Sequence, residues 1–203
     1  MDLLLYDRFG KPINFARGSR EHGGLLVQQV GGDFDEAVDR GNVFIAANQT
    51  TVTTQAGLSA TTPALSVANR AGSKKVVKLW YVGAQNLVAW TAAAAVWLAQ
   101  GGSAVAAAVT ETTTATVRNA KTGDSGVPNG VAILSVATLP AAPVAISLLG
   151  AGLTGLITTL TGIAPFGRWY NGALRLAPGF NWSVQTSTAG SLFCEFIIEV
   201  VDE

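Results

Sequence analysis

Histidine and cysteine are almost missing from this sequence, and their scarcity limits the chemistry available to it. His22 is the only histidine and Cys194 the only cysteine among 203 residues. Ser–His and Cys–His catalytic pairs, multi-histidine zinc sites and a disulfide framework are therefore unsupported. We expect His22 to be an ordinary surface histidine and Cys194 to be a small buried side chain in a strand.

Carboxylates are just as sparse through the middle of the chain. Glu111 is the only acid between Asp39 and Asp124, and no acid occurs between Asp124 and Glu195. Acid–base and glycoside-hydrolysing enzymes need two such groups within reach of each other. Glu195 and Glu199 are spaced to share one face of a strand, where solvated charges are the ordinary explanation. We therefore predict no catalytic residue, no cofactor and no metal ion, and a protein that is not an enzyme.

Charge of both signs is low, and neither sign is in excess. Charged residues make up 13% of the chain, with 13 basic and 13 acidic side chains and a net charge of zero; an ordinary soluble domain has about 25%. Without a basic excess, direct binding to nucleic acid is not expected. So few charges would solvate a lone monomer poorly, so we expect part of the surface to be covered in an assembly.

Two motifs suggest a ligand, but each has a simpler explanation. Gly150 to Gly155 matches the dinucleotide fingerprint, yet the following residues are β-branched, Gly162 interrupts them, and Arg175 stands where an acid is needed. We expect a glycine-rich loop there. Asp33 to Glu36 with Asp39 could attract Ca²⁺, but the loop glycine and ligand spacing of an EF-hand are missing, so we expect a solvated acidic turn.

Charge-free runs raise the question of a membrane. Residues 79–110 and 125–167 carry no charge, but polar residues and glycines interrupt the first run, and Pro140 and Pro143 interrupt the second. Neither is a clean span of ~20 apolar residues, so we do not expect membrane insertion. The first residues carry charges instead of the basic tip and apolar run of a secretory signal, which predicts synthesis in a cytoplasm without export.

The first 42 residues differ in composition from the remainder. They hold 12 of the 26 charged side chains together with many glycines, and they lack helical or strand periodicity. We predict an extended N-terminal arm over residues 1–42, with one possible short strand from Leu25 to Val30. Aromatic residues punctuate this arm and are our candidates for contacts with a neighbouring subunit: Tyr6, Phe9, Phe15 and Phe34. An ordinary tail packed on its own domain is the alternative.

From residue 43 to 203 the pattern predicts one antiparallel β-domain. Short β-branched runs alternate with Gly, Asn, Pro and Ser at spacings that suit a sandwich or barrel. The predicted strands are Val43 to Ala46, Thr50 to Thr54, Ala64 to Val67, Val76 to Val82, Thr112 to Val117, Val131 to Ala137, Val144 to Leu149, Trp182 to Thr186 and Leu192 to Val201. Ala92 to Ala99 could begin a short helix instead. Pro178-Gly179 predicts a type II turn of a hairpin.

Several runs resemble small structural proteins of tailed bacteriophages. They are Gly41 to Gln49, Thr53 to Ser59, Val96 to Ala99 and Leu176 to Gly179, and the likeness extends over residues 43–201. The resemblance implies a jelly-roll β-sandwich in the virion, made in the host bacterial cytoplasm, that stabilises the head as a capsid decoration or cement protein. It also implies a homo-oligomer, a trimer in the favoured version, with the major capsid protein or other virion proteins as partners.

Two alternatives stay open. The chain could be another virion component, such as a head-fibre base, a tail part or a receptor-binding module that meets a glycan through exposed aromatic residues. The candidate aromatics for that role are Trp80, Trp90, Trp169 and Trp182, although each suits a core position as well. A membrane-associated protein that uses the two charge-free runs is the second alternative.

Overall fold

The computed structural model describes residues 32–86, 90, 92–102, 113–152 and 166–203. Two compact units, Met1–Glu36 and Ala37–Glu203, are distinguished, and each is considered by itself. The described elements are α1 (Gly32–Asp39), β1 (Val43–Ala47), β2 (Val52–Thr53), β3 (Ser66–Asn69), β4 (Lys75–Asn86), β5 (Ala94–Gly102), β6 (Thr113–Thr114), β7 (Thr116–Asn119), β8 (Val131–Ser135), β9 (Val144–Gly152), β10 (Phe166–Leu176), β11 (Phe180–Thr186) and β12 (Ser191–Asp202).

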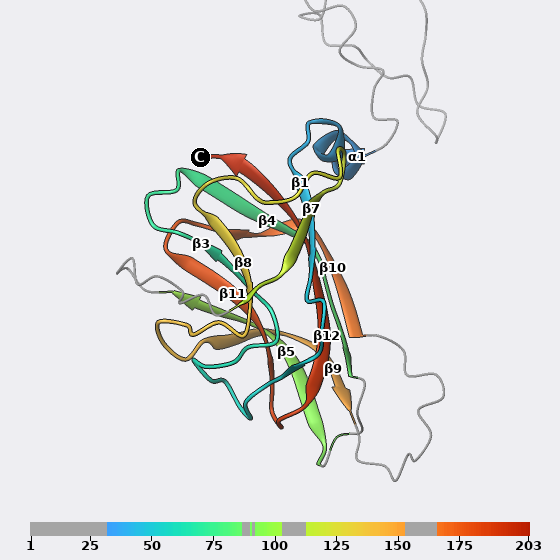
Figure 1. Cartoon of the computed structure of the whole chain (residues 1–203), viewed down its shortest axis with the longest axis vertical. Coiled ribbons are helices and arrows are strands. Elements are labelled where there is room, and N and C mark those ends of the chain that lie inside the picture. The colour runs from blue at the N-terminus through green and yellow to red at the C-terminus, as the bar shows by residue number, and fades with distance from the viewer. Residues whose placement is uncertain (1–31, 87–89, 91, 103–112, 153–165) are drawn as a thin grey trace, which may run out of the picture. The chain divides into compact units, whose positions relative to one another are not determined.

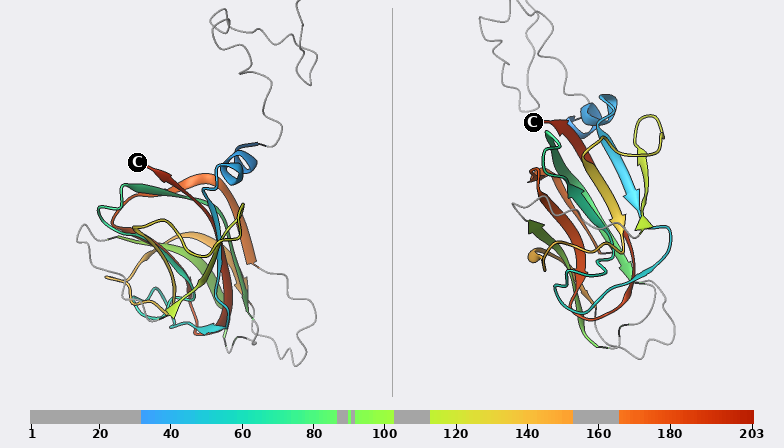
Figure 2. Two further views of the ribbon diagram at one scale, coloured as in Figure 1. Left: turned by 45° about the horizontal axis from the view of Figure 1, so that its top comes forward. Right: turned by 60° about the vertical axis from the view of Figure 1, so that its left-hand side comes forward.

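The strands form two antiparallel sheets that pack face to face (Figure 1), as the mainly β prediction of a sandwich required. Sheet 1 has the order β10-β4-β12-β1-β7, with β2 also paired to β12. Sheet 2 has the order β6-β8-β3-β11-β5-β9. β10 ends sheet 1 beside β9, which ends sheet 2, so these two strands border one side of the sandwich, and β7, β6 and β8 lie at the other ends of the two sheets. Figure 2 shows the two sheets from two further directions.

Alternation along the long strands determines which side chains enter the core. In β12, Leu192, Cys194, Phe196, Ile198 and Val200 are all buried and belong to one apolar cluster between the sheets. Sheet 2 contributes Trp182, Val184, Leu98 and Ile133 to the same cluster, among others. Because successive side chains of a strand point to opposite faces, the odd-numbered residues of β12 face away from the core.

The acidic segment is a helix, which corrects the prediction of an extended arm and an acidic turn over these residues. Helix α1 begins with Asp33 and Asp35 in its first turn, where carboxylates stabilise the positive end of the helix dipole. It ends at Asp39, and Gly41 follows with a φ of 75° that allows the amide nitrogens of Gly41 and Asn42 to donate to the carbonyls of Val38 and Ala37. A helix of eight residues is too short for its periodicity to stand out in the sequence.

The Pro178-Gly179 turn forms, but it does not close a hairpin. Phe180 N donates to Ala177 O at 3.3 Å, and Gly179 has the φ of 88° that the third position of a type II turn requires. The strands that it joins belong to different sheets, since β10 pairs with β4 and β11 pairs with β3 and β5. The turn therefore carries the chain from one sheet to the other. The residues of a turn do not determine whether the strands on its two sides pair with each other.

Two further differences concern strands. Most of the segment Ala92 to Ala99, which could have begun a helix, lies in strand β5 (Ala94–Gly102), because this strand lies between β11 and β9 and alternates buried with half-buried side chains. β10 begins at Phe166 and is much longer than Leu174 to Leu176, the residues that lead into the predicted Pro178-Gly179 turn. Its exposed polar, aromatic and glycine residues do not give the alternation of apolar and polar side chains that predicts a strand.

Candidate functional site

The predicted contact residues fall mostly outside the described part of the chain. Tyr6, Phe9 and Phe15 lie in residues 1–31, as do His22 and the possible strand from Leu25 to Val30. Phe34 is described and lies half-buried in α1. The contact role of these four aromatic residues stays a prediction.

Of the two ligand motifs, the glycine-rich one is described only in part. Gly150 to Gly152 are the last residues of β9, and residues 153–155 lie outside the described ranges. Among the described residues, no group of three or more His, Cys, Asp or Glu side chains is placed to hold a metal ion. A helix with the length and apolar character needed to span a membrane does not occur in the part of the chain that the structure describes.

Cys194 is the buried strand cysteine that the sequence predicts. Its side chain is 3% exposed and faces the core from β12. Burial, followed by the negative charge of Glu195, raises the pKa of the thiol far above its ordinary value. The thiolate is the reactive form of cysteine, so this residue is chemically inert in the folded protein.

Glu199 is not the solvated charge that its spacing suggested. It is only 3% exposed, and both of its carboxylate oxygens accept hydrogen bonds from Lys78 Nζ at 3.1 Å. Trp80 Nε1 donates to Glu199 Oε2 at 3.3 Å. Trp80 is an extra residue in β4, at the point where the register shifts against both β12 and β10. This bulge places the indole beside the carboxylate.

The outer face of sheet 1 carries a row of large side chains that the sequence analysis did not identify as a group. Trp169, Tyr81, Ile197 and Ile45 stand directly opposite one another on β10, β4, β12 and β1. Trp169 is 54% exposed and Ile45 41% exposed. Residues that face each other across neighbouring strands share one face of the sheet, so this row crosses four strands, or ~14 Å at the usual strand spacing.

Tyr81 lies across two glycines that occupy the neighbouring row. A Cβ built on Gly83 would lie 2.9 Å from Tyr81 Cε1, and one built on Gly167 would collide with the Tyr81 hydroxyl. Any larger residue at these two positions would displace the phenol ring. The ring of Trp169 packs beside it, with ring centroids 4.9 Å apart and planes inclined by 45°. The Tyr81 ring therefore lies over the sheet surface, and the Trp169 ring is inclined to it at one side.

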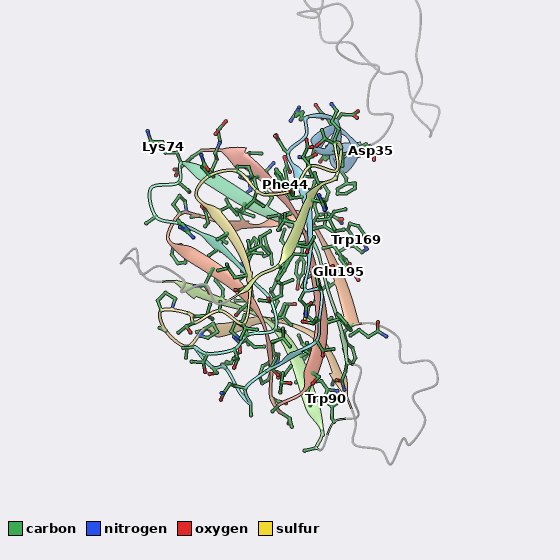
Figure 3. The ribbon with its side chains drawn as sticks, viewed as in Figure 1. Asp35, Phe44, Lys74, Trp90, Trp169 and Glu195 are labelled. Carbon is green, nitrogen blue, oxygen red and sulfur yellow. The ribbon has the colours of Figure 1, made fainter. Side chains whose placement is uncertain are left out.

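Glu195 adds an exposed carboxylate to this cluster. Its Oε1 would lie 2.8 Å from a Cβ on Gly83, so the carboxylate occupies space next to the Tyr81 ring. Burial raises the pKa of Tyr81, and the negative charge of Glu195 adds to this effect. Within the described residues, the Glu195 side chain has no hydrogen bond or ion pair, whereas its backbone pairs with β1 and β4. Figure 3 labels Trp169 and Glu195 on this side of the sandwich.

A hollow of about 200 Å³ adjoins the carboxylate. It is lined by residues of β1, β4 and β12 and by Asn48, which follows β1. The lining residues are Ala47, Asn48, Gly83, Ala84, Gln85, Phe193, Cys194 and Glu195. We call the row, the two rings, Glu195 and this hollow the sheet 1 surface. Of the four tryptophans that could meet a glycan, Trp80, Trp90 and Trp182 are buried, and Trp169 alone is exposed.

The second notable surface is β9, the terminal strand of sheet 2 among the described residues. Val144, Ile146 and Leu148 are 68%, 42% and 55% exposed, and no residue of the strand is charged. β5 pairs with one edge of β9, with two register shifts. Edge strands in soluble proteins usually carry charges, prolines or a covering element that prevents pairing with another chain. β9 itself carries neither charge nor proline, and the contacts from β10 are the Arg168 hydrogen bond to the Ser147 hydroxyl, at 3.2 Å, and the Phe166 ring beside Gly150.

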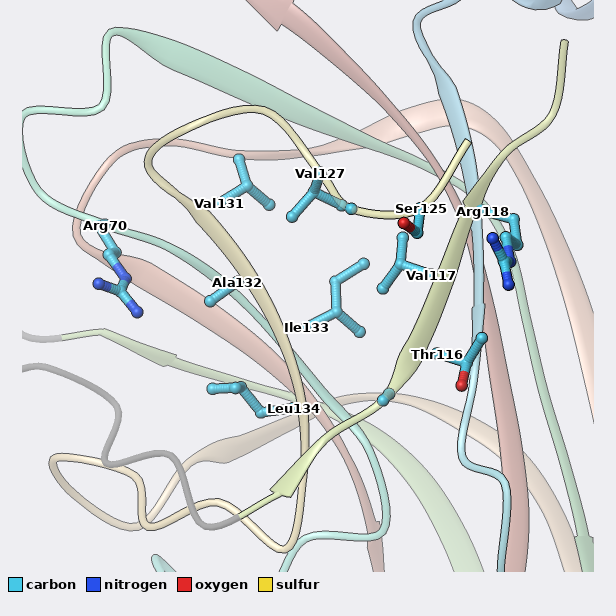
Figure 4. Close-up of a pocket in the computed structure, with 12 residues that line it drawn as sticks. Arg70, Thr116, Val117, Arg118, Ser125, Val127, Val131, Ala132, Ile133 and Leu134 are labelled. Atoms are coloured by element: carbon cyan, nitrogen blue, oxygen red, sulfur yellow. The ribbon is translucent and has the colours of Figure 1, made fainter. Parts of the chain in front are cut away.

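A groove of about 500 Å³ lies on the opposite side of the sandwich, between β7 and β8 (Figure 4). Its interior is apolar and includes Val117, Val127 and Ile133, which point toward one another in Figure 4. Arg70 and Arg118 stand at its two ends. The groove and β9 are thus two apolar features at opposite borders of the sheets.

Comparisons with known proteins leave this geometry to be interpreted by itself. No protein-family model, no curated protein and no solved structure matches the chain.

Proposed function

We propose that this chain is a structural subunit of a bacteriophage particle, a capsid decoration or cement protein that works through contacts between protein surfaces. The observation that carries the proposal is β9, an uncharged terminal strand with three large apolar side chains in water. Its attribution to a virion rests on the resemblance of residues 43–201 to structural proteins of tailed phages. In this proposal the chain catalyses no reaction and holds no cofactor.

The assembly contact joins two different surfaces of neighbouring copies. β9 of one subunit packs against the β7–β8 groove of the next, which brings Ile146 and Leu148 against the apolar interior around Val117 and Ile133. Because the two surfaces lie at opposite borders of the sandwich, the contact is head-to-tail, and repetition of such a contact closes into a ring when the rotation permits. A ring of three subunits agrees with the expected trimer.

Burial of these side chains supplies the driving force. A large aliphatic side chain stabilises by ~1.5–3 kcal/mol when it passes from full exposure to full burial. Val144, Ile146 and Leu148 begin partly buried, so each contributes part of that amount. The low charge of the chain adds to the effect, because few charged groups have to lose water when the surfaces meet.

Intermolecular cross-linking tests this contact. In the double variant Ile146→Cys, Thr116→Cys, the first position lies on β9 and the second is an exposed residue that lines the groove. Mild oxidation is expected to produce a closed cross-linked trimer on non-reducing gels. Cys194 is buried and does not interfere. A matched control replaces Thr116→Cys by Thr122→Cys, at an exposed position that does not line the groove.

The outcomes separate three arrangements. Cross-linking of the test pair but not of the control supports the head-to-tail ring. Efficient dimer formation by Ile146→Cys alone would show that two β9 strands pair with each other, and would overturn the ring. A chain that sediments as a monomer and cross-links in neither variant contradicts the whole proposal.

Capsid binding tests the attribution to a virion. The full chain is mixed with purified phage capsids that lack it, and binding is measured by co-sedimentation. We expect the full chain to bind and a chain without residues 1–35 to lose binding while the trimer stays folded. Equal binding by both chains would refute the role of the arm, and no binding by either would refute the decoration function.

A further inference from the structure

Among the surfaces that assembly does not use, the sheet 1 surface has the features of a ligand site. We infer that it binds a neutral oligosaccharide, with Tyr81 and Trp169 as stacking partners and Glu195 as a hydrogen-bond acceptor. This inference goes beyond the assembly function, because neither β9 nor the β7–β8 groove takes part in it. Its evidence is the arrangement of rings, carboxylate and hollow on β10, β4 and β12.

The two rings offer the apolar part of the site. The Tyr81 ring lies across Gly83 and Gly167, so one of its faces is supported by the backbone of the sheet. Trp169 is 54% exposed and inclined by 45° to that ring. Tyrosine and tryptophan are suited to partly wet surfaces because each combines a large apolar ring with a polar end. The C–H face of a sugar ring is apolar and can stack on such a surface.

The polar groups beside the rings match sugar hydroxyls. The Glu195 carboxylate accepts hydrogen bonds only, whereas the Gln85 amide both donates and accepts, as the Tyr81 hydroxyl does. Glu195 and Gln85 line the same hollow, and the Glu195 carboxylate accepts no hydrogen bond from the described residues. A hydroxyl group also both donates and accepts, so it can satisfy each of these side chains. A tyrosine hydroxyl is protonated at neutral pH, and burial, followed by the charge of Glu195, raises the pKa of Tyr81 further.

The shape and charge of the surface favour a neutral chain of sugars over other ligands. The row from Trp169 to Ile45 crosses four strands, which suits an elongated ligand. The hollow of about 200 Å³ is smaller than a pocket for a drug-sized ligand, ~300–1,000 Å³, and suits one ring-sized group. The charge of Glu195 disfavours acidic sugars. A quaternary ammonium group would be attracted to the rings and the carboxylate but would leave Gln85 without a role.

Ligand-observed NMR with the intact chain tests the site. The probes are the hexasaccharides of glucose in β-1,4 and α-1,4 linkage, of N-acetylglucosamine and of mannose, with hexagalacturonate and choline as charged probes. We expect saturable binding of at least one neutral hexasaccharide. Trp169→Ala and Glu195→Gln should each weaken it roughly tenfold or more, as expected when a stacking ring or a charged acceptor is removed.

Phe180→Ala is the matched control, because Phe180 is an exposed aromatic residue of β11 in the other sheet, 40% exposed. It should leave sugar binding unchanged. Thermal unfolding of each variant shows that a loss of binding does not reflect a loss of fold, and Trp169→Phe should restore much of the binding that Trp169→Ala removes.

Three results would overturn the inference. The first is the failure of every neutral hexasaccharide to bind at millimolar concentration. The second is choline binding that depends on Trp169 and Glu195 in the absence of sugar binding, which would identify a cation site. The third is sugar binding that Trp169→Ala and Phe180→Ala weaken equally, because this would place the ligand elsewhere. The oligomeric state is not affected by any of these results, so the assembly proposal is tested separately.

Discussion

Glu199 and Glu195 lie four residues apart on the same face of β12, yet their surroundings differ completely. Glu199 is 3% exposed and is held by Lys78 and the indole of Trp80. Glu195 is exposed and lies beside the Tyr81 ring, and its carboxylate has no hydrogen bond or ion pair with the described residues. The neighbours that β4 supplies make this difference. A bulge at Trp80 covers one glutamate, whereas Gly83 leaves room for the other.

The comparison teaches that the position of a charge on a strand does not determine its exposure. Alternation along β12 places both glutamates on the outer face, as the sequence predicts. Which part of that face is covered depends on side chains of β4, more than a hundred residues earlier in the chain. Glu199 stabilises the sandwich through its buried hydrogen bonds, whereas the exposed carboxylate of Glu195 is the one that the proposed sugar site uses.

The largest expected effect comes from breaking the buried ion pair. Glu199→Ala leaves Lys78 without its partner, and loss of one member of a buried pair costs ~3–5 kcal/mol of unfolding free energy. We expect about 3 kcal/mol, at the lower end of that range, because Lys78 keeps 26% of its side-chain surface in water. Glu195→Ala should change stability by less than ~0.5 kcal/mol, as surface substitutions do. Urea denaturation measures both variants.

A double variant tests whether the pair is the cause. Glu199→Leu with Lys78→Met replaces both charges by apolar side chains of similar size, and it should be less destabilised than Glu199→Leu alone. A double variant that loses the sum of the two single effects would contradict the assignment. Losses of equal size for Glu195→Ala and Glu199→Ala would remove the contrast altogether.

A smaller effect is expected on the ionisation of Tyr81. Burial and the charge of Glu195 both raise its pKa, so the neutral phenol persists to higher pH than in an ordinary tyrosine. Glu195→Gln removes the charge and should lower the pKa, whereas Glu199→Gln should leave it unchanged. The ultraviolet absorbance of tyrosinate, compared with that of a Tyr81→Phe variant, follows this titration. An identical titration in all three glutamate backgrounds would show that Glu195 does not act on the ring.

The smallest effect concerns Cys194, which lies next to Glu195 but faces the core. Burial and then the charge of Glu195 raise the pKa of its thiol, so we expect almost no reaction with a thiol reagent at pH 8 until the chain unfolds. Glu195→Gln removes only the smaller of these two causes and should hardly increase the rate. Ellman's reagent measures it, and rapid labelling of the native chain would show that the strand opens.

Much of the architecture could be predicted from local patterns. The β-branched runs at Val43 and Val144 and the alternation after Ser191 correspond to β1, β9 and β12. These predictions succeed because side-chain alternation and turn residues act over only a few positions. In β10 only the last residues, which lead into the Pro178-Gly179 turn, were noticed in the sequence. Most of its side chains are exposed or half-buried, so the strand shows no regular alternation of apolar and polar residues. Helix α1 was missed because a short helix depends on capping more than on periodicity.

The candidate site was harder to predict than the fold. Trp169 was one of four tryptophans considered, and nothing in the sequence distinguishes it from Trp80, Trp90 or Trp182. It lies on a terminal strand of sheet 1 with its side chain on the outer face, whereas Trp182 lies on a central strand of sheet 2 facing the core. Sheet order is a long-range property, so a residue's distance from the border of a sheet is not encoded in its neighbours along the chain.

The sequence by itself determined the strand content, the scarcity of charge and titratable chemistry, and the alternation that places Glu195 and Glu199 on one face, because these depend on composition and short-range geometry. Only the tertiary structure decided which strands end the sheets, that Pro178-Gly179 crosses between them, and that Tyr81 lies over Gly83 and Gly167 with Trp169 beside it. These features depend on pairing between segments far apart in the chain. Register and sheet order follow from the packing of the whole core, which no local pattern specifies.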